Sequence, residues 1–162
     1  MLIDLTYRCN MGCNHCMSDC KSNGTDMTPE ILKDVLAFCK KNEVPNLIFS
    51  GGEMFENPHI LELLKIIEKE WDKRFPLSFI TNGRKLADTP DIFEAVQDMQ
   101  KKYGKKKIMI QVTDDPRFYP QPLSEKQKYR LKKLDAVIEG VTGNGNKCLY
   151  PQGRTLENFD DS

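Results

Sequence analysis

Three cysteines near the start of the chain have the spacing and the chemistry of a metal site. Cys9, Cys13 and Cys16 form a C-x3-C-x2-C pattern directly after an apolar run. A loop this short can direct three sulfurs toward one centre, which a lone helix or strand cannot do. Three thiolates suit a soft metal ion or an iron–sulfur cluster. A fourth ligand would close the site as in structural zinc, whereas three ligands leave one position open.

The other cysteines and histidines of the chain keep one alternative open. The chain has six cysteines and two histidines. Cys20 could be a fourth ligand, so a zinc site is an alternative at this point. Cys39 belongs to a predicted helix, where a free cysteine packs as a small hydrophobic residue. Cys148 is isolated in the sequence and cannot build a second cluster by itself.

The composition argues against several classes of partner. The 162 residues include 24 basic and 24 acidic side chains, so the balanced charge creates no overall field that favours nucleic acid or an anionic membrane. No segment approaches the ~20 apolar residues of a membrane span, and the N-terminus lacks the pattern of a signal peptide. We therefore expect a cytoplasmic protein without a nucleic-acid or membrane partner. In that reducing compartment the cysteine triplet favours metal binding over disulfides.

The elements that must position the cysteines alternate between strands and helices. Strands are expected over residues 2–7, 46–50, 77–81, 108–113 and 136–140. Helices are expected to begin at Thr28-Pro29, Asn57-Pro58, Thr89-Pro90 and Ser124, where capping residues or prolines stand. This alternation predicts right-handed βαβ units and a parallel sheet.

The remaining residues with chemical potential all follow a predicted strand. Residues 51–53 (Gly-Gly-Glu) follow the second strand, residues 81–83 (Thr-Asn-Gly) end the third, and Thr113 and Asp114 end the fourth. Parallel sheets of this kind place their chemistry at the carboxyl ends of the strands. One edge of the sheet should therefore collect the cysteine loop, the glycine turn and these polar residues.

The cysteine triplet and the glycine turn together resemble the signature of the radical S-adenosylmethionine (SAM) superfamily. That signature is C-x3-C-x2-C followed by a Gly-Gly-Glu turn after the second strand, and the resemblance covers about residues 2–139. It implies that Cys9, Cys13 and Cys16 hold a [4Fe–4S] cluster. The fourth iron of that cluster would chelate the amino and carboxylate groups of SAM.

The resemblance also implies which residues contact SAM: Gly51, Gly52, Glu53, His15, Thr81, Asn82, Thr113 and Asp114. Bare glycines let the backbone approach a ligand closely, and their carbonyls can accept from its ammonium group. A bulky residue at Gly52 should therefore prevent SAM binding and leave the cluster in place. For His15 and for residues 81–83, the alternatives are an ordinary loop residue and a plain turn.

The fold implied by the resemblance is α/β, a partial, open (βα) TIM-like barrel with parallel strands. Four βα units and a fifth strand stand where the family usually has six units, either in a naturally short member or in a fragment. We expect a core over residues 1–140 and a C-terminal tail over residues 141–162. The tail should fold across the open edge, with Leu149 and Tyr150 as apolar anchors and Arg154 near a carboxylate at the mouth.

The activity implied by the resemblance is reductive cleavage of SAM. An external electron donor would supply one electron, and the products would be methionine and a 5′-deoxyadenosyl radical that takes hydrogen from the substrate. The open barrel suits a peptide or protein substrate, and the Gly-Arg segment at residues 153–154 is similar to one in peptide-modifying members. The alternatives are an activase for a glycyl-radical enzyme, favoured by the small size, and a non-catalytic metal-binding remnant.

Overall fold

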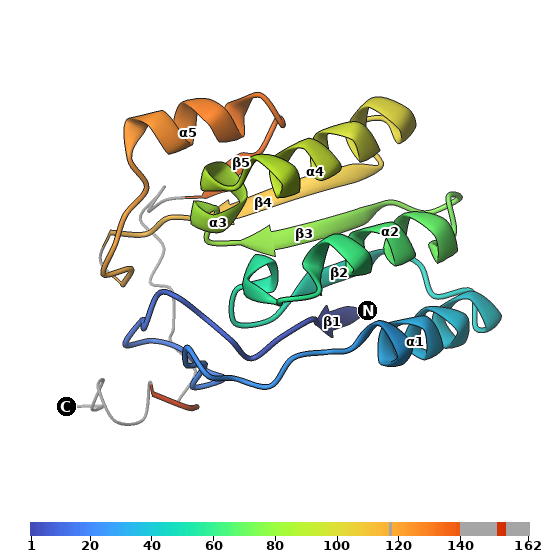
Figure 1. Ribbon diagram of the computed structural model, residues 1–162, viewed down its shortest axis with the longest axis horizontal. Coiled ribbons are helices and arrows are strands. Elements are labelled where there is room, and N and C mark those ends of the chain that lie inside the picture. The colour runs from blue at the N-terminus through green and yellow to red at the C-terminus, as the bar shows by residue number, and fades with distance from the viewer. Residues whose placement is uncertain (117, 140–151, 155–162) are drawn as a thin grey trace.

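The computed structural model describes residues 1–116, 118–139 and 152–154 (Figure 1). Within these residues five parallel strands form one sheet, in the order in which they occur in the chain. The strands are β1 (Leu2–Asp4), β2 (Leu47–Ser50), β3 (Leu77–Thr81), β4 (Ile108–Thr113) and β5 (Val137–Glu139). The helices are α1 (Pro29–Lys41), the 3-10 helix η1 (Met54–Glu56), α2 (Ile60–Glu70), α3 (Arg84–Asp88), α4 (Pro90–Tyr103) and α5 (Glu125–Lys132).

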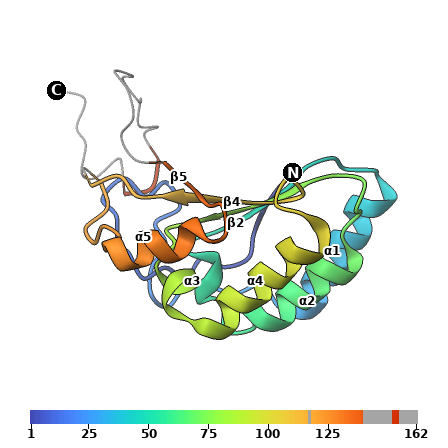
Figure 2. The same ribbon diagram turned by 90° about the horizontal axis from the view of Figure 1, so that it is seen from above.

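The helices α1 to α5 all lie on the same face of the sheet (Figure 2). Because side chains alternate along a strand, β3 buries Leu77 and Phe79 under this helical layer, while Ser78 and Ile80 point to the other face and are half-buried. Among the described strands, β1 and β5 each pair on one side only. The predicted fold class is therefore confirmed: a parallel α/β sheet that remains open, as in a partial barrel.

The predicted starts of the first and last helices are confirmed by their caps. The Thr28 hydroxyl accepts from the amide of Ile31, and Pro29 occupies the first turn of α1. Ser124 and Gln127 form the predicted capping box at α5. None of the described helices has both the length and the apolar character needed to cross a membrane.

Three sequence-based expectations about the elements are wrong. The first strand ends at Asp4 rather than residue 7, because the chain beyond it turns to form isolated bridges with residues 21 and 26. Helix α2 begins at Ile60, after His59, since the Asn57 side chain is held by other contacts. Helix α3 was not expected, because its five residues carry too little helical periodicity. Cys148, Leu149 and Tyr150 lie outside the described residues.

Asn57 joins the end of the first strand to the segment before α1. Its side-chain amide donates to the carbonyls of Leu5 (2.7 Å) and Met27 (3.0 Å), and the side chain is almost fully buried. We expect Asn57→Ala to lower the free energy of unfolding by about 1–3 kcal/mol, since a buried side chain loses its hydrogen bonds to Leu5, Met27 and the His59 amide. Urea unfolding of the metal-free protein measures this. The exposed Asn42, which donates to Phe38 at 2.8 Å, is the control: Asn42→Ala should cost less than about 1 kcal/mol, and equal losses would contradict the prediction.

Candidate functional site

A cavity of about 450 Å³ lies where β1 to β4 end, which is a usual size for a small-molecule site. Most of the predicted site residues line it: Cys9, Cys13, Cys16, His15, Gly51, Gly52, Thr81, Asn82 and Thr113. Glu53 and Asp114, also predicted, are not on its wall. The structure therefore brings the cysteine loop, the glycine turn and the ends of β3 and β4 to one place.

The cysteine loop is anchored at its base by polar contacts. The Arg8 guanidinium pairs with Asp26 at 2.8 Å, and the Thr6 hydroxyl donates to the same carboxylate at 2.6 Å. The amide of Cys9 donates to the carbonyl of Lys21 at 2.9 Å, which joins the two ends of the loop. These contacts hold the three cysteines above the carboxyl end of β1.

The environment of Cys9 and Cys13 favours the neutral thiol over the thiolate unless a positive charge lies nearby. Burial, together with the nearby Cys9 and Cys16 sulfurs, raises the pKa of Cys13 to about 12, and burial also raises the pKa of Cys9. Metal binding requires the thiolate, and a bound cation supplies the charge that stabilises it. The amide of Cys20 donates to the Cys16 sulfur at 3.3 Å. The donor set thus fits iron ions held by three thiolates.

The described residues contain no group of three His, Cys, Asp or Glu side chains arranged to hold a single metal ion. A cluster of several irons does not require such convergence, because each thiolate binds a different iron. The cavity beside the sulfurs is where a cluster and its ligand would lie.

The glycine turn packs against the strand that leads into the cysteine loop. The amide of Gly52 donates to the Thr6 carbonyl at 2.7 Å, and that of Glu53 donates to the Arg8 carbonyl at 2.8 Å. A Cβ atom at Gly51 would lie 2.3 Å from the Thr6 oxygen, and one at Gly52 would lie 2.5 Å from the Arg8 oxygen. The two glycines therefore allow a close approach between two backbone segments, besides lining the cavity.

Glu53 ties the glycine turn to the end of β3. Its carboxylate accepts from the Thr81 hydroxyl (2.7 Å), the Asn82 amide (2.7 Å) and the Phe55 amide (3.2 Å). The side chain is 1% exposed, and burial raises its pKa to about 7. The sequence suggested a carboxylate beside the ligand, whereas the structure places Glu53 behind the cavity wall.

The raised pKa of Glu53 predicts a pH-dependent stability. The folded protein holds this proton up to about pH 7, while the unfolded chain releases it near the ordinary value of 4.5. Glu53 therefore stabilises the fold fully below pH 4.5, and this contribution of up to roughly 3 kcal/mol disappears as the pH rises through 7. We expect the free energy of unfolding of the metal-free protein to fall between pH 5 and pH 8, and to fall less in Glu53→Gln.

Urea titrations at several pH values measure this difference. The matched control is Glu62→Gln, which removes an exposed carboxyl from α2. It should retain the parent's dependence on pH. Identical pH profiles for Glu53→Gln and the parent would contradict the assignment.

The end of β4 differs from the sequence-based expectation by one residue. Asp114 accepts from the amide of Leu123 at 3.0 Å and faces Lys128, so it holds the loop before α5. Asp115, which follows the same strand but was not among the expected SAM contacts, lines the cavity. Thr113 lines it too, and its hydroxyl accepts from the Tyr119 hydroxyl at 2.7 Å.

Two aromatic residues beside His15 on the cavity wall, Phe118 and Tyr119, were missed by sequence reasoning. The ring of His15 lies 5.0 Å from that of Phe118 and 5.3 Å from that of Tyr119. Burial lowers the pKa of His15, which favours a neutral ring. The adjacent aromatic residues in the loop after the fourth strand were the available signal. They add aromatic rings to a cavity wall that also has the polar ends of β3 and β4.

The segment at residues 152–154 reaches the cysteine loop from the far end of the chain. Arg154 lines the cavity, and its guanidinium lies 3.2 Å from the Asp19 carboxylate, as the sequence led us to expect for a carboxylate at the mouth. The same segment appears in red beside the blue loop in Figure 1. The described part of the tail thus contacts the cysteine loop, whereas the expected contact was with the open edge of the sheet.

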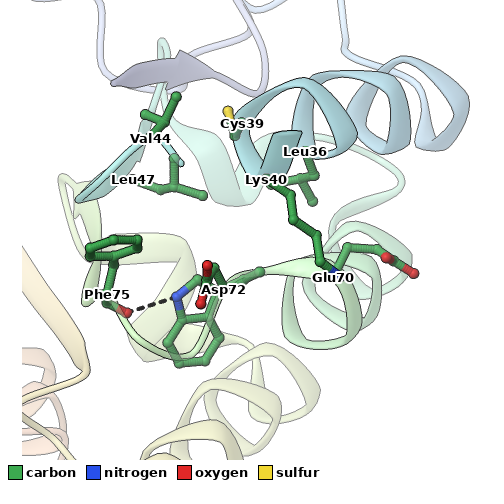
Figure 3. Close-up of a pocket in the computed structure, with 9 residues that line it drawn as sticks. Leu36, Cys39, Lys40, Val44, Leu47, Glu70, Asp72 and Phe75 are labelled. Carbon is green, nitrogen blue, oxygen red and sulfur yellow. Dashed lines mark hydrogen bonds between the residues drawn. The ribbon is translucent and has the colours of Figure 1, made fainter. Parts of the chain in front are cut away.

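Figure 3 shows a second cavity at the other end of the sheet, between the end of α1, the start of β2 and the turn after α2. Its volume is about 10 Å³, enough for at most one water molecule. Trp71 is one of the residues that line it, and its indole donates to the Phe75 carbonyl at 2.9 Å. This cavity is a packing feature of the core.

Comparison with known proteins identifies the family. Residues 3–129 match the family model described as the radical SAM superfamily, and the chain belongs to that superfamily. It is 34% identical over 83 residues to the putative peptide biosynthesis protein YydG of Bacillus subtilis, a match over 50% of this chain and 25% of YydG. It is 31% identical over 86 residues to a probable GTP 3′,8-cyclase of Methanocella arvoryzae, over 52% of this chain and 27% of that protein.

A solved structure gives a more distant match. The crystal structure of Streptococcus suis SuiB bound to S-adenosylmethionine has a TM-score of 0.45 and 15% identity, over 93% of this chain and 42% of SuiB. SuiB bound to the precursor peptide SuiA has the same TM-score and 16% identity, over 87% and 39% of the two chains. The matched segments thus span about a quarter of the curated relatives and less than half of SuiB.

Proposed function

We propose that the chain binds a [4Fe–4S] cluster through Cys9, Cys13 and Cys16, binds SAM in the adjoining cavity, and modifies a peptide or protein. Membership of the radical SAM superfamily supports an enzyme of this type. The observation that carries the proposal is the single cavity of about 450 Å³, which has the three cysteines and both turn glycines on its wall.

Cys9, Cys13 and Cys16 would hold the cluster, and with SAM bound it would supply the single electron needed for reductive cleavage of SAM to methionine and a hydrogen-abstracting 5′-deoxyadenosyl radical. The chain's own residues bind and orient. The Gly51-Gly52 turn brings backbone polar groups to the cavity, and Thr81 and Asn82 offer polar atoms at the end of β3. The rings of His15, Phe118 and Tyr119 offer an aromatic surface of the kind that binds a purine.

A peptide or protein substrate is supported by the relative and by the open sheet. The relative YydG is named as a putative peptide biosynthesis protein. In the described part of the chain, no helix covers the sheet face opposite α1 to α5 (Figure 2), and Met109 and Val137 on β4 and β5 are exposed. A face of this kind can accept an extended chain. The electron would come from an external donor.

Anaerobic reconstitution tests the proposal. The protein is treated with iron and sulfide, and then with dithionite and SAM, and 5′-deoxyadenosine is quantified by chromatography. We expect its formation with the parent protein and none with Cys13→Ala. A protein that binds iron but forms no 5′-deoxyadenosine would be a non-catalytic remnant. A mass change in a peptide encoded beside the gene would then test the substrate class.

A further inference from the structure

The Gly153-Arg154 segment makes four hydrogen bonds to the loop that carries the second and third cysteines. The Arg154 amide donates to the Cys16 carbonyl at 3.0 Å. The side chain donates from Nε to the Cys13 carbonyl at 2.9 Å, and from Nη1 to the Cys20 carbonyl at 3.0 Å and to Asp19 at 3.2 Å. One arginine therefore contacts both ends and the middle of residues 13–20.

Two backbone hydrogen bonds lie within the loop itself. Its internal backbone bonds are long, 3.3 Å from the Cys16 amide to Cys13 and 3.4 Å from the Asp19 amide to Cys16. Asp19 has a φ of 45°, a left-handed conformation that is unfavourable for most residues other than glycine. The carboxylate of Asp19 is held by Lys21 and Arg154. Arg154 adds hydrogen bonds of 2.9–3.2 Å that connect residues 13, 16, 19 and 20.

Gly153 is required for this approach. Its φ of 59° is left-handed, and a Cβ atom there would lie 2.4 Å from the Met17 carbonyl oxygen and 2.6 Å from that of Cys16. Any side chain would push the segment off the loop. Glycine therefore brings the backbone into contact, and the neighbouring arginine then spans the loop.

We infer that Gly153 and Arg154 form a clamp that positions the cysteine loop and places a fixed positive charge beside the iron site. This rests on the proposed ligand role of the cysteines. Arg154 lines the same cavity, with a side chain only 17% exposed, so solvent screens its charge incompletely. A nearby positive charge favours the reduced, more negative state of an iron–sulfur cluster.

Four variants separate the two parts of the inference. Arg154→Gln removes both the positive charge and the planar set of guanidinium N–H donors, whereas Arg154→Lys keeps the charge but not that set of donors. Gly153→Ala leaves the arginine in the chain but blocks its approach. Arg74→Gln is the matched control, since it removes the same charge from an exposed turn before β3.

Hydrogen exchange of residues 13–20 in the metal-free protein tests the clamp without any cofactor. We expect exchange about tenfold faster in Arg154→Gln and in Gly153→Ala, and no change in Arg74→Gln. Equal rates in all variants would overturn the inference. This readout is independent of the proposed function, because it would stand even if the parent protein failed to bind a cluster.

The reconstituted protein tests the effect on the iron site. We expect iron loss to a chelator to be 10–100-fold faster in Arg154→Gln, the usual effect of losing a residue that orients metal ligands. The cluster's reduction potential should fall in Arg154→Gln and remain near the parent value in Arg154→Lys. An unchanged potential in Arg154→Gln with an intact cluster would overturn the electrostatic role.

Discussion

Replacing any one of Cys9, Cys13 and Cys16 by alanine should abolish the iron chromophore of the reconstituted protein. All three line one cavity, and a cluster held by only three protein thiolates cannot lose one of them without losing much of its affinity. We expect about four irons per parent chain and less than about a tenth of that in each variant. Iron analysis and the visible absorption spectrum measure the result.

Two other cysteines provide matched controls. Cys39 lies on α1 with its side chain buried in the core, and Met1 is its sulfur neighbour, so Cys39→Ala should keep the chromophore. Cys20 lines the cavity, and its variant distinguishes the cluster from zinc. If Cys20→Ala keeps full iron binding, Cys20 is not a ligand. Stoichiometric zinc, no iron uptake and loss of that zinc in Cys20→Ala would contradict the cluster.

Gly52→Val should remove both iron binding and SAM binding. Gly52→Ala should remove most of each. The added Cβ would lie 2.5 Å from the Arg8 carbonyl oxygen and 3.0 Å from the Cys20 Cβ, so the turn or the cysteine loop has to move. The sequence alone suggested that the cluster would survive and only SAM would be lost. The structure changes that expectation, because Gly52 packs against the loop that carries the ligands.

The measurement is the iron bound by the parent protein and by the Gly52 variants. Circular dichroism checks that the proteins compared have the same folded fraction. The control is Gly104→Ala, since a Cβ there meets nothing within 4 Å and the left-handed φ of 90° costs only backbone energy at the end of α4. This variant should lose about 1 kcal/mol of stability and keep its iron. Full iron binding by Gly52→Val would show that the turn and the loop can separate.

The parts of the fold that could be predicted depend on local chemistry. Strand β4 and the caps at Thr28 and Ser124 follow from alternation and from side chains that bond within three residues. The position of α2 could not be predicted, because the Asn57 side chain that would have capped it contacts carbonyls up to 52 residues away. A local pattern carries no information about such a contact.

The candidate site shows the same division. Parallel sheets place their functional residues at the carboxyl ends of the strands, and this rule correctly predicted that the cysteines, the glycines and Thr113 lie together at one cavity. The rule could not tell which carboxylates face that cavity. Asp114 and Asp115 are neighbours at the end of β4, and the amide of Leu123 holds the first of them away from the wall. Glu53 is likewise buried by its contacts with Thr81 and Asn82, which come from another strand.

The contact between Cys13 and Arg154 joins residues 141 positions apart, and this separation sets an order of events during synthesis. At 5–20 residues per second, the ribosome makes Arg154 roughly 7–28 s after Cys13. Throughout that interval the cysteine loop exists without its arginine, and the contacts at its base, such as those among Thr6, Arg8 and Asp26, are the ones that can form. In a nascent chain, the thiols of Cys9, Cys13 and Cys16 would therefore be accessible to iron before Arg154 is made. The hydrogen bonds of Arg154 to the cysteine loop would form last.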